Sequence, residues 1–303
     1  GLLIAASRGH TIELYGPPGK GKTMLALAVT SILPSLSFDE VLETTSIHSV
    51  AGTSSDPLIT APPFRSPHHT SSYVSMVGGG AFPRPGEITL AHQGVLFLDE
   101  FPEFDRRVIE SLREPLEEHS ITISRAKGTA RFPARFILVA AFNPCPCGNF
   151  GSRKRCTCSP LSLERYRKKI SGPIIDRIDM WVEVSNIDHE KLSRKHREGE
   201  SGLFAKEILK TRKRQRKRFA GHGSRLNTNS DMGVRDLETF INLSEKVLTL
   251  LKGASQKLDL SPRSYHRVIK LARTIADLDE KDNIEEPHML EALQYRPKSF
   301  MTS

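Results

Sequence analysis

The hydrophobic positions in the first half of the chain gather into three short segments that predict β-strands. The first, Thr11 to Tyr15, runs into a glycine-rich loop and then into MLALAVTSIL, an apolar segment with helical spacing that Pro34 ends. The others, VLFLDE (95–100) and FILVAAFN (136–143), are continuous rather than alternating runs. Continuous runs are typical of parallel strands covered on both faces. The pattern predicts an α/β core with a parallel sheet flanked by helices.

Polar segments connect these strands. Residues 61–94 form a Gly- and Pro-rich stretch that is too long for an ordinary connection, so we expect a functional insertion there. Residues 105–119, DRRVIESLREPLEEH, predict one helix. In residues 120–136 the alternation of apolar and polar positions around Gly128 predicts a β-hairpin.

The pattern changes to helices from about Leu203 onward. Helical spacing recurs in residues 203–220, 236–254 and 261–278, and a last helix is expected near Glu286 to Tyr295. The polar stretch Ser185 to Gly202 separates the two patterns. The sequence therefore predicts an α/β core over residues 1–190 and a small all-helical domain over residues 203–303.

The glycine-rich loop carries the first chemical signal. GPPGKGKT matches the pattern G-x-x-x-x-G-K-T in full, with Gly16, Pro17, Pro18, Gly19, Lys20, Gly21, Lys22 and Thr23. The motif follows a strand and opens a helix, which is the context that phosphate binding requires. Backbone N–H groups can turn toward the phosphates, Lys22 can reach the β and γ oxygens, and Thr23 can ligate magnesium. ATP and Mg²⁺ are the expected ligands.

Polar residues end the next two strands. Asp99 can hold the magnesium ion and Glu100 can polarise the attacking water, although an ordinary acidic strand end is the alternative. Asn143 ends the third strand and would lie at the same sheet edge, where it could orient the water or act only as a turn former. A P-loop upstream favours the catalytic interpretation.

The only four cysteines of the chain lie within fourteen positions, in the pattern C-x-C-x8-C-x-C. They are Cys145, Cys147, Cys156 and Cys158. Four thiolates this close can form a tetrahedral zinc site. The inner spacing is tighter than the usual C-x2-C knuckle, so reduced thiols or a redox pair remain alternatives to structural zinc.

Charge and hydropathy limit the partners. A formal net charge of +9 and a pI near 9.4 make a polyanion such as DNA a plausible partner. The run RKRQRKR (212–218) could neutralise DNA phosphates, or form a solvated helix face or a subunit contact. No apolar run approaches the roughly 20 residues that span a bilayer. We therefore expect a cytoplasmic protein that does not use a membrane.

Longer segments resemble the magnesium-chelatase-like AAA+ ATPases and, within them, the bacterial ComM/YifB competence-associated helicase branch. The resemblance is carried by FRSPHHTSS, PRPGEITLAHQGVLFLDEFPEF, LREPLE, ITISRA, FPARFILVAAFNPCPCG, SGPIIDRIDM and SYHRVIKLARTIADL. It covers nearly the whole chain. It implies an AAA+ P-loop NTPase core and a ring, expected to be a hexamer, with ATP bound between subunits.

The resemblance also implies roles for single residues. Arg177 is similar to the arginine finger that reaches a neighbouring subunit's γ-phosphate, and Arg263 to the sensor-2 arginine. A salt bridge with a neighbouring aspartate is the alternative for Arg177, and a surface position is the alternative for Arg263. Lys127 resembles a hairpin lysine that touches DNA in minichromosome-maintenance helicases, against the alternative of an exposed lysine that keeps an edge soluble.

Three features qualify the resemblance. Lys20 stands where the family usually carries threonine and adds a charge near the phosphates. The chain starts almost at the first strand, so we expect a fragment that lacks the family's N-terminal part. His68 and His69 could bind metal, shape a pore-facing loop or simply bond locally.

The resemblance implies an ATP-driven DNA translocase or helicase that promotes branch migration during recombination in natural transformation. One alternative is a magnesium-chelatase-type motor subunit, and another is a MoxR-like protein-remodelling ATPase, both without DNA. The cysteine cluster and the net basicity favour the helicase branch. Asp99, Glu100 and Asn143 argue against a module that uses nucleotide only as a switch.

Overall fold

The computed structural model describes residues 1–7, 9–53, 57–125, 128–150, 154–170, 172–184, 200–221 and 226–297. The described chain divides into two compact units. The sheet unit holds the described residues of Glu13–Ile175 and Glu183–His196. The helical unit holds those of Gly1–Ile12, Asp176–Val182 and Arg197–Ser303. Among the described residues, no helix is both long and apolar enough to cross a bilayer.

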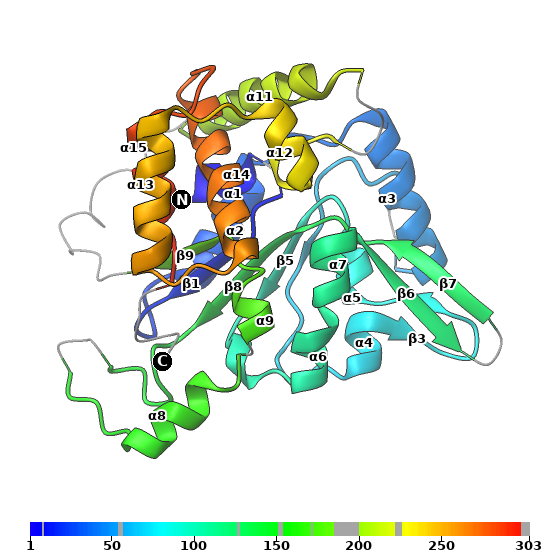
Figure 1. Cartoon of the computed structure of the whole chain (residues 1–303). Coiled ribbons are helices and arrows are strands. Elements are labelled where there is room, and N and C mark those ends of the chain that lie inside the picture. Colours follow the sequence, from blue (N-terminus) through cyan, green and yellow to red (C-terminus); the bar gives the residue numbers. More distant parts are fainter. Residues whose placement is uncertain are drawn as a thin grey trace. The chain divides into compact units, whose positions relative to one another are not determined.

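A five-stranded sheet forms the core, in the order β2-β5-β8-β1-β9 (Figure 1). Its strands are β1 (Ile12–Tyr15), β2 (Phe64–Arg65), β5 (Val95–Leu98), β8 (Ile137–Phe142) and β9 (Met180–Glu183). The register of the parallel β5–β8 pair places Leu98 beside Ala140. Every residue of β1, β5 and β8 is buried, as the continuous apolar runs predicted. The expected α/β fold is confirmed.

Helices cover the sheet or flank its edges. Helix α2 (Lys22–Ile32) packs against β5 and β8, and the residues that it buries include Ala26, Val29 and Ile32. Helix α3 (Phe38–Ala51), which the apolar pattern did not predict, begins with a capping box between Ser37 and Glu40. Other short helices of the sheet unit include η1 (Phe101–Glu103), α8 (Pro160–Arg167) and α9 (Gly172–Ile175).

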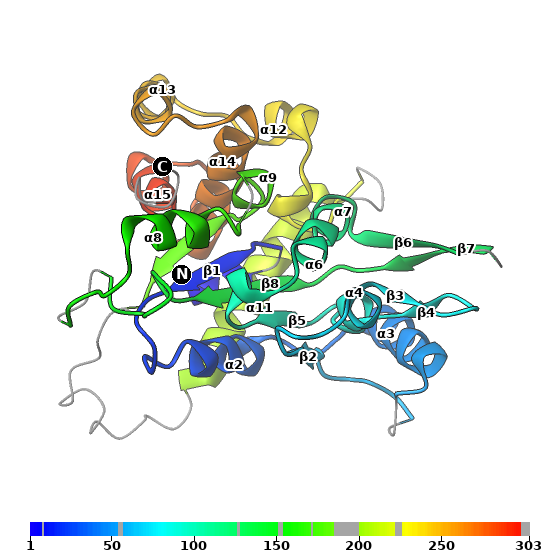
Figure 2. The ribbon, with the colours of Figure 1, turned by 90° about the horizontal axis from the view of Figure 1, so that it is seen from below.

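The polar insertion at 61–94 is built from short elements. It contains β2, α4 (Tyr73–Val77), β3 (Gly78–Gly79), β4 (Arg84–Pro85) and α5 (Glu87–Leu90). The β3–β4 pair lies beside the predicted hairpin, which is formed by β6 (Ser120–Arg125) and β7 (Gly128–Pro133) (Figure 2). Gly78 makes the approach possible, because a Cβ there would lie 2.7 Å from Ile123 Cδ1.

The single helix predicted over 105–119 was wrong, because two helices occupy the segment. Helix α6 (Arg106–Ser111) ends at Leu112, and α7 (Arg113–Glu118) starts there. Pro115 explains the break, since it lacks the N–H that would bond the carbonyl of Ser111 and its ring crowds that carbonyl.

The helical unit consists of seven described helices around α14. They are α1 (Leu2–Ala6), α11 (Glu200–Phe219), η2 (Asn229–Asp231), α12 (Val234–Phe240), α13 (Glu245–Lys257), α14 (Pro262–Leu278) and α15 (Glu286–Gln294). Helix α14 contacts α1, α11, α12 and α15 (Figure 1). The helix predicted over 236–254 is divided into α12 and α13, because Ser244 caps a new helix by accepting a bond from Val247 N at 3.4 Å.

Buried ion pairs hold this unit together. Asp179 accepts hydrogen bonds from the backbone N–H of Thr11 at 2.8 Å and from Arg267 at 2.5 Å. Burial alone would raise the pKa of Asp179, but Arg267, His10 and Thr11 hold it well below its usual range. Asp277 is likewise buried and bonds Arg218 and Arg273.

The basic run 212–218 is divided between two faces of α11. Arg212, Arg214 and Arg218 turn inward, toward Ala6 O, Asp282 and Asp277 respectively. Lys213, Arg216 and Lys217 are exposed. Half of the run therefore serves packing within the helical unit, and only the exposed half is available to a polyanion.

Candidate nucleotide site and cysteine cluster

The loop between β1 and α2 has the backbone geometry that phosphate binding needs. Gly19 and Gly21 adopt φ values of 74° and 76°, in the left-handed region that favours glycine. A Cβ on Gly16 would lie 2.3 Å from the carbonyl oxygen of Val184, so only glycine fits there. These glycines set the backbone path of the loop, and Pro18 and Gly19 are exposed at its tip.

The side chain of Lys22 folds back into the P-loop, where the phosphates of a nucleotide would bind. Its ammonium donates to the carbonyl oxygens of Gly16 at 2.8 Å and Pro17 at 3.1 Å, and to Asn143 Oδ1 at 3.0 Å. Burial lowers the pKa of Lys22, and the nearby charge of Asp99 partly offsets this effect. A desolvated ammonium ion that touches only neutral oxygens gains strongly from an arriving phosphate.

Thr23 and Asp99 meet where a magnesium ion would sit. Thr23 Oγ1 lies 3.2 Å from Asp99 Oδ2. Adjacent ligands of an octahedral magnesium ion, at about 2.1 Å from the metal, lie about 3 Å apart. The two predicted ligands are therefore spaced for one ion or for a water bound to it.

Glu100 follows the strand end in a strained conformation, with a φ of 52°. Its backbone N–H donates to Asp99 Oδ1 at 2.9 Å, and its half-exposed side chain meets His69, with Nδ1 2.9 Å from Glu100 Oε2. His69 itself packs against His68 and Phe104. Sequence reasoning did not link His69 to this carboxylate, because the two residues lie far apart in the chain.

A second residue beneath the site was also missed. Glu13 lies on β1, is completely buried and, among the described residues, has no hydrogen-bond partner for either carboxylate oxygen. Burial raises the pKa of Glu13 well above its usual value. The signal was a lone acid inside an otherwise apolar strand.

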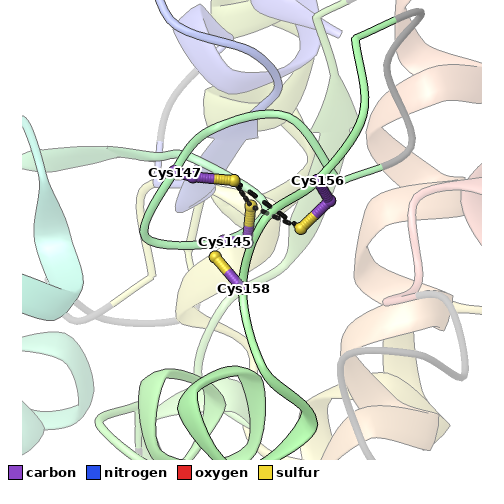
Figure 3. A group of neighbouring side chains, drawn as sticks. All are labelled: Cys145, Cys147, Cys156 and Cys158. Atoms are coloured by element: carbon purple, nitrogen blue, oxygen red, sulfur yellow. Dashed lines mark hydrogen bonds between the residues drawn. The ribbon is translucent and has the colours of Figure 1, made fainter.

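The four cysteines converge on one point (Figure 3). All four Sγ atoms lie within 4.8 Å of one another. The separations of Cys145, Cys147 and Cys156 are 3.4, 3.8 and 3.6 Å. Backbone N–H groups of Asn149 and Thr157 lower the pKa of Cys147 to about 5, whereas burial raises the pKa of Cys145. The cluster has the donor set of a tetrahedral zinc site.

The structure describes two of the three residues carried over from the family. Arg177 belongs to the helical unit and is 7% exposed, and its carbonyl accepts a bond from Thr11. Arg263 is exposed at the start of α14. Lys127 lies outside the described residues. The roles of all three remain predictions, as do the phosphate contacts of Lys20 and its neighbours.

A glycine-rich loop between a parallel strand and a helix, with Lys22 inside it and Thr23 against an acidic strand end, defines a class of protein. This class is the P-loop nucleotide-binding fold of the AAA+ type. The helical region expected with such a core is present in residues 200–221 and 226–297.

Comparison with known proteins identifies the family. The family model "Magnesium chelatase, subunit ChlI" matches residues 1–192, and "Magnesium chelatase, subunit ChlI C-terminal" matches residues 198–296. The chain belongs to the magnesium chelatase subunit ChlI family.

Individual relatives agree with this assignment. The chain is 44% identical over 299 residues to the uncharacterized protein YifB of Escherichia coli K12, covering 98% of this chain and 58% of the relative. It is 43% identical over 297 residues to competence protein ComM of Haemophilus influenzae, covering 97% of this chain and 57% of the relative. A DNA replication licensing factor, Mcm6 of Drosophila pseudoobscura pseudoobscura, is 24% identical over 230 residues, covering 71% of this chain and 26% of the relative. The chain thus spans less than two thirds of the length of its most similar relatives.

Proposed function

We propose that this protein is an ATP-hydrolysing, ring-forming motor that moves DNA and promotes branch migration during recombination in natural transformation. The observation that carries the ATPase part is the meeting of Thr23 Oγ1 and Asp99 Oδ2 at 3.2 Å, beside Lys22 and Glu100. In this proposal Lys22 binds the β and γ phosphates, Thr23 and Asp99 hold Mg²⁺, Glu100 polarises the attacking water, and Asn143 orients that water.

The ring belongs to the proposal because a single protomer provides no arginine from a neighbour. Arg177 is proposed to act in trans and Arg263 as the sensor-2 residue, both by resemblance to the family. Support for a protein interface next to the site comes from α2, where Met24 is 72% and Leu27 50% exposed. Apolar side chains of this size gathered on one helix favour contact with another protein surface. A hexamer is the expected assembly.

DNA is supported by the paired hairpins of the sheet unit. They expose Arg84 on β4, Arg125 on β6 and Arg131 on β7, and Phe82 between β3 and β4 is 69% exposed. Arginines neutralise phosphates and an exposed aromatic ring can stack on a base. The printed names of two relatives, a competence protein and a DNA replication licensing factor, point in the same direction.

The cofactors of the proposal are ATP, Mg²⁺ and a structural zinc ion at the four cysteines. The zinc is proposed as structural because four thiolates fill a tetrahedral shell and leave no position for a reacting water. We propose a cytoplasmic location, in keeping with reduced thiols.

The experiment is the steady-state ATPase rate with and without forked or four-way DNA, on protein shown to assemble. Glu100→Gln serves as the control for contaminating activity. Stimulation by DNA that the variant abolishes is the expected result. A rate indifferent to DNA in an assembled preparation would overturn the DNA motor.

A chelatase-type motor that remodels a partner protein is the second candidate, since the matching family model describes magnesium chelatase. It uses the same ATP site without DNA. Stimulation of the ATPase by a partner protein, with no response to DNA, would favour it, and stimulation by unfolded protein would favour a MoxR-like remodelling ATPase.

A further inference from the structure

One short loop belongs to both the nucleotide site and the cysteine cluster. It begins at Asn143, the residue that ends β8 and accepts a hydrogen bond from Lys22 at 3.0 Å. Cys145, the completely buried member of the cluster, follows two residues later. Because Cys145 is only two residues from Asn143, a movement of the cluster also moves Asn143.

The same loop also touches the P-loop from the side. Gly148 is buried and has a φ of 76°, and a Cβ at this position would lie 2.6 Å from Pro18 Cδ and 3.0 Å from Pro18 Cγ. Contacts this short leave no room for a side chain. The backbone of the cysteine loop thus packs directly on the ring of Pro18, at the tip of the P-loop.

The sulfur positions suit a metal ion. Four sulfurs at about 2.3 Å from a zinc ion form a tetrahedron with edges of about 3.8 Å. The sulfurs of Cys145, Cys147 and Cys156 are 3.4 to 3.8 Å apart, near this value and far above the roughly 2.05 Å of a disulfide. The backbone N–H of Phe150 donates to Cys145 Sγ at 3.3 Å, a bond that stabilises a thiolate ligand.

We infer that a zinc ion held by Cys145, Cys147, Cys156 and Cys158 braces the P-loop, so that nucleotide binding depends on this metal. The inference rests on the ATP site of the proposed function. It adds that the metal-bound cysteine loop supports this site. The metal joins the Cys145–Cys147 turn to the Cys156–Cys158 segment. It thereby fixes Gly148 against Pro18 and Asn143 against Lys22.

Without the metal, only weak S–H···S hydrogen bonds hold the sulfurs near one another. The cysteine loop is then held less firmly. Pro18 then loses the Gly148 backbone as its packing partner, and the tip of the P-loop loses its support. Oxidation of the cysteines to disulfides would have a related effect, because sulfurs now 3.4 Å or more apart would have to approach to roughly 2.05 Å.

The first test measures metal and nucleotide together. Zinc content is determined on the purified protein, and binding of a fluorescent N-methylanthraniloyl ADP is titrated before and after treatment with a chelator selective for zinc over magnesium, with Mg²⁺ held constant. ADP is chosen because it needs no arginine from a neighbouring subunit. All four cysteines of the chain lie in the cluster, so a thiol reagent that releases zinc reports on this site alone.

The expected result is about one zinc per chain and a loss of ADP affinity of about tenfold or more on its removal, reversed when zinc is restored, in line with the 10- to 100-fold effects of support around a site. Protein without zinc would overturn the inference. So would a zinc protein whose ADP affinity does not change when the metal is removed and circular dichroism shows that the fold persists.

A pair of glycine variants keeps the test decisive if removal of zinc unfolds the protein. Gly148→Ala introduces a methyl group against Pro18 and leaves all four ligands in place. Gly52→Ala is the matched control, because Gly52 has a nearly equal φ of 70° but nothing within 4 Å of its Cβ position. We expect Gly148→Ala to retain zinc and to weaken ADP binding about tenfold relative to Gly52→Ala. Equal affinities would overturn the brace.

Failure of the inference and failure of the proposed function give different results. If the zinc-loaded protein hydrolyses ATP but DNA does not change the rate, the proposed DNA motor is wrong and the proposed role of zinc is unaffected. If DNA stimulates hydrolysis while zinc removal and Gly148→Ala leave ADP affinity unchanged, the proposed role of zinc is wrong and the proposed DNA motor is supported.

Discussion

His69 Nδ1 lies 2.9 Å from Glu100 Oε2, which ties the insertion to the carboxylate proposed to polarise the attacking water. His69 precedes α4 and the β3–β4 hairpin, whose exposed arginine and Phe82 are proposed to touch DNA. A ligand on the hairpin can therefore influence Glu100 through a short stretch of backbone. In the structure the contact occupies one of the two oxygens that a water molecule would approach.

We expect His69→Ala to raise the DNA-free ATPase rate about fivefold, which is the equivalent of the roughly 1 kcal/mol of one hydrogen bond. The ratio of stimulated to basal rate should fall, because the hairpin no longer controls Glu100. His68→Ala is the comparison, because it removes the ring that packs on His69 but leaves the contact with the carboxylate in place. Unchanged basal rate and unchanged stimulation in His69→Ala would contradict this prediction.

Asn143 should act on turnover rather than on nucleotide binding. Its amide accepts one bond from Lys22, whereas two backbone carbonyls hold the same ammonium independently. Asn143→Ala should therefore lower kcat about 100-fold, the scale observed when one preorganised polar group is removed from a reaction site. ADP affinity should change by less than about threefold. A parallel loss of ADP affinity would show that Asn143 only supports the P-loop.

Thr23 and Asp99 should set the magnesium requirement. Thr23→Val keeps the shape of the side chain and removes the oxygen that lies 3.2 Å from Asp99 Oδ2. We expect half-maximal ATPase activity to need about tenfold more Mg²⁺, as for the loss of one ligand interaction of about 1.4 kcal/mol. Thr23→Ser retains the hydroxyl and serves as the control. An identical Mg²⁺ titration for the valine and serine variants would exclude Thr23 as a ligand.

The sequence predicted the site better than the periphery of the fold, for a physical reason. The P-loop, Asp99 and Asn143 each follow a buried strand, and parallel strands bring their carboxyl ends to one edge of the sheet. Lys22–Asn143 and Thr23–Asp99 then meet because the sheet order requires it. Strand β2 could not be predicted in the same way, since it has two residues and no periodicity to detect.

Other differences arose from single residues that local pattern reasoning passed over. Pro115 divides the helix predicted over 105–119, and Ser244 starts a new helix within 236–254. The pairing of His69 with Glu100 is a contact between distant segments, which no spacing rule encodes. The convergence of the cysteines was predictable because all four lie in one short segment.

Glu13 provides a prediction about stability. Its carboxyl is completely buried on β1, and burial raises its pKa well above the usual value. The folded protein therefore keeps a proton that the unfolded chain releases above a pKa of about 4.3. In the window from that value up to the raised folded pKa, the folded state binds more protons, so the free energy of unfolding falls as the pH rises.

Glu13→Gln preserves the shape of the side chain and cannot ionise. Urea unfolding of both proteins at several pH values between 5 and 8 should show a variant that is more stable than the parent by about 1 to 3 kcal/mol near neutral pH, with the gap narrowing toward pH 5. The exposed Glu117→Gln substitution is the control for a general effect of removing a negative charge. A gap that does not depend on pH would mean that folding leaves the pKa of Glu13 unchanged. A variant less stable at pH 8 would mean that Glu13 is ionised and paired in the folded protein.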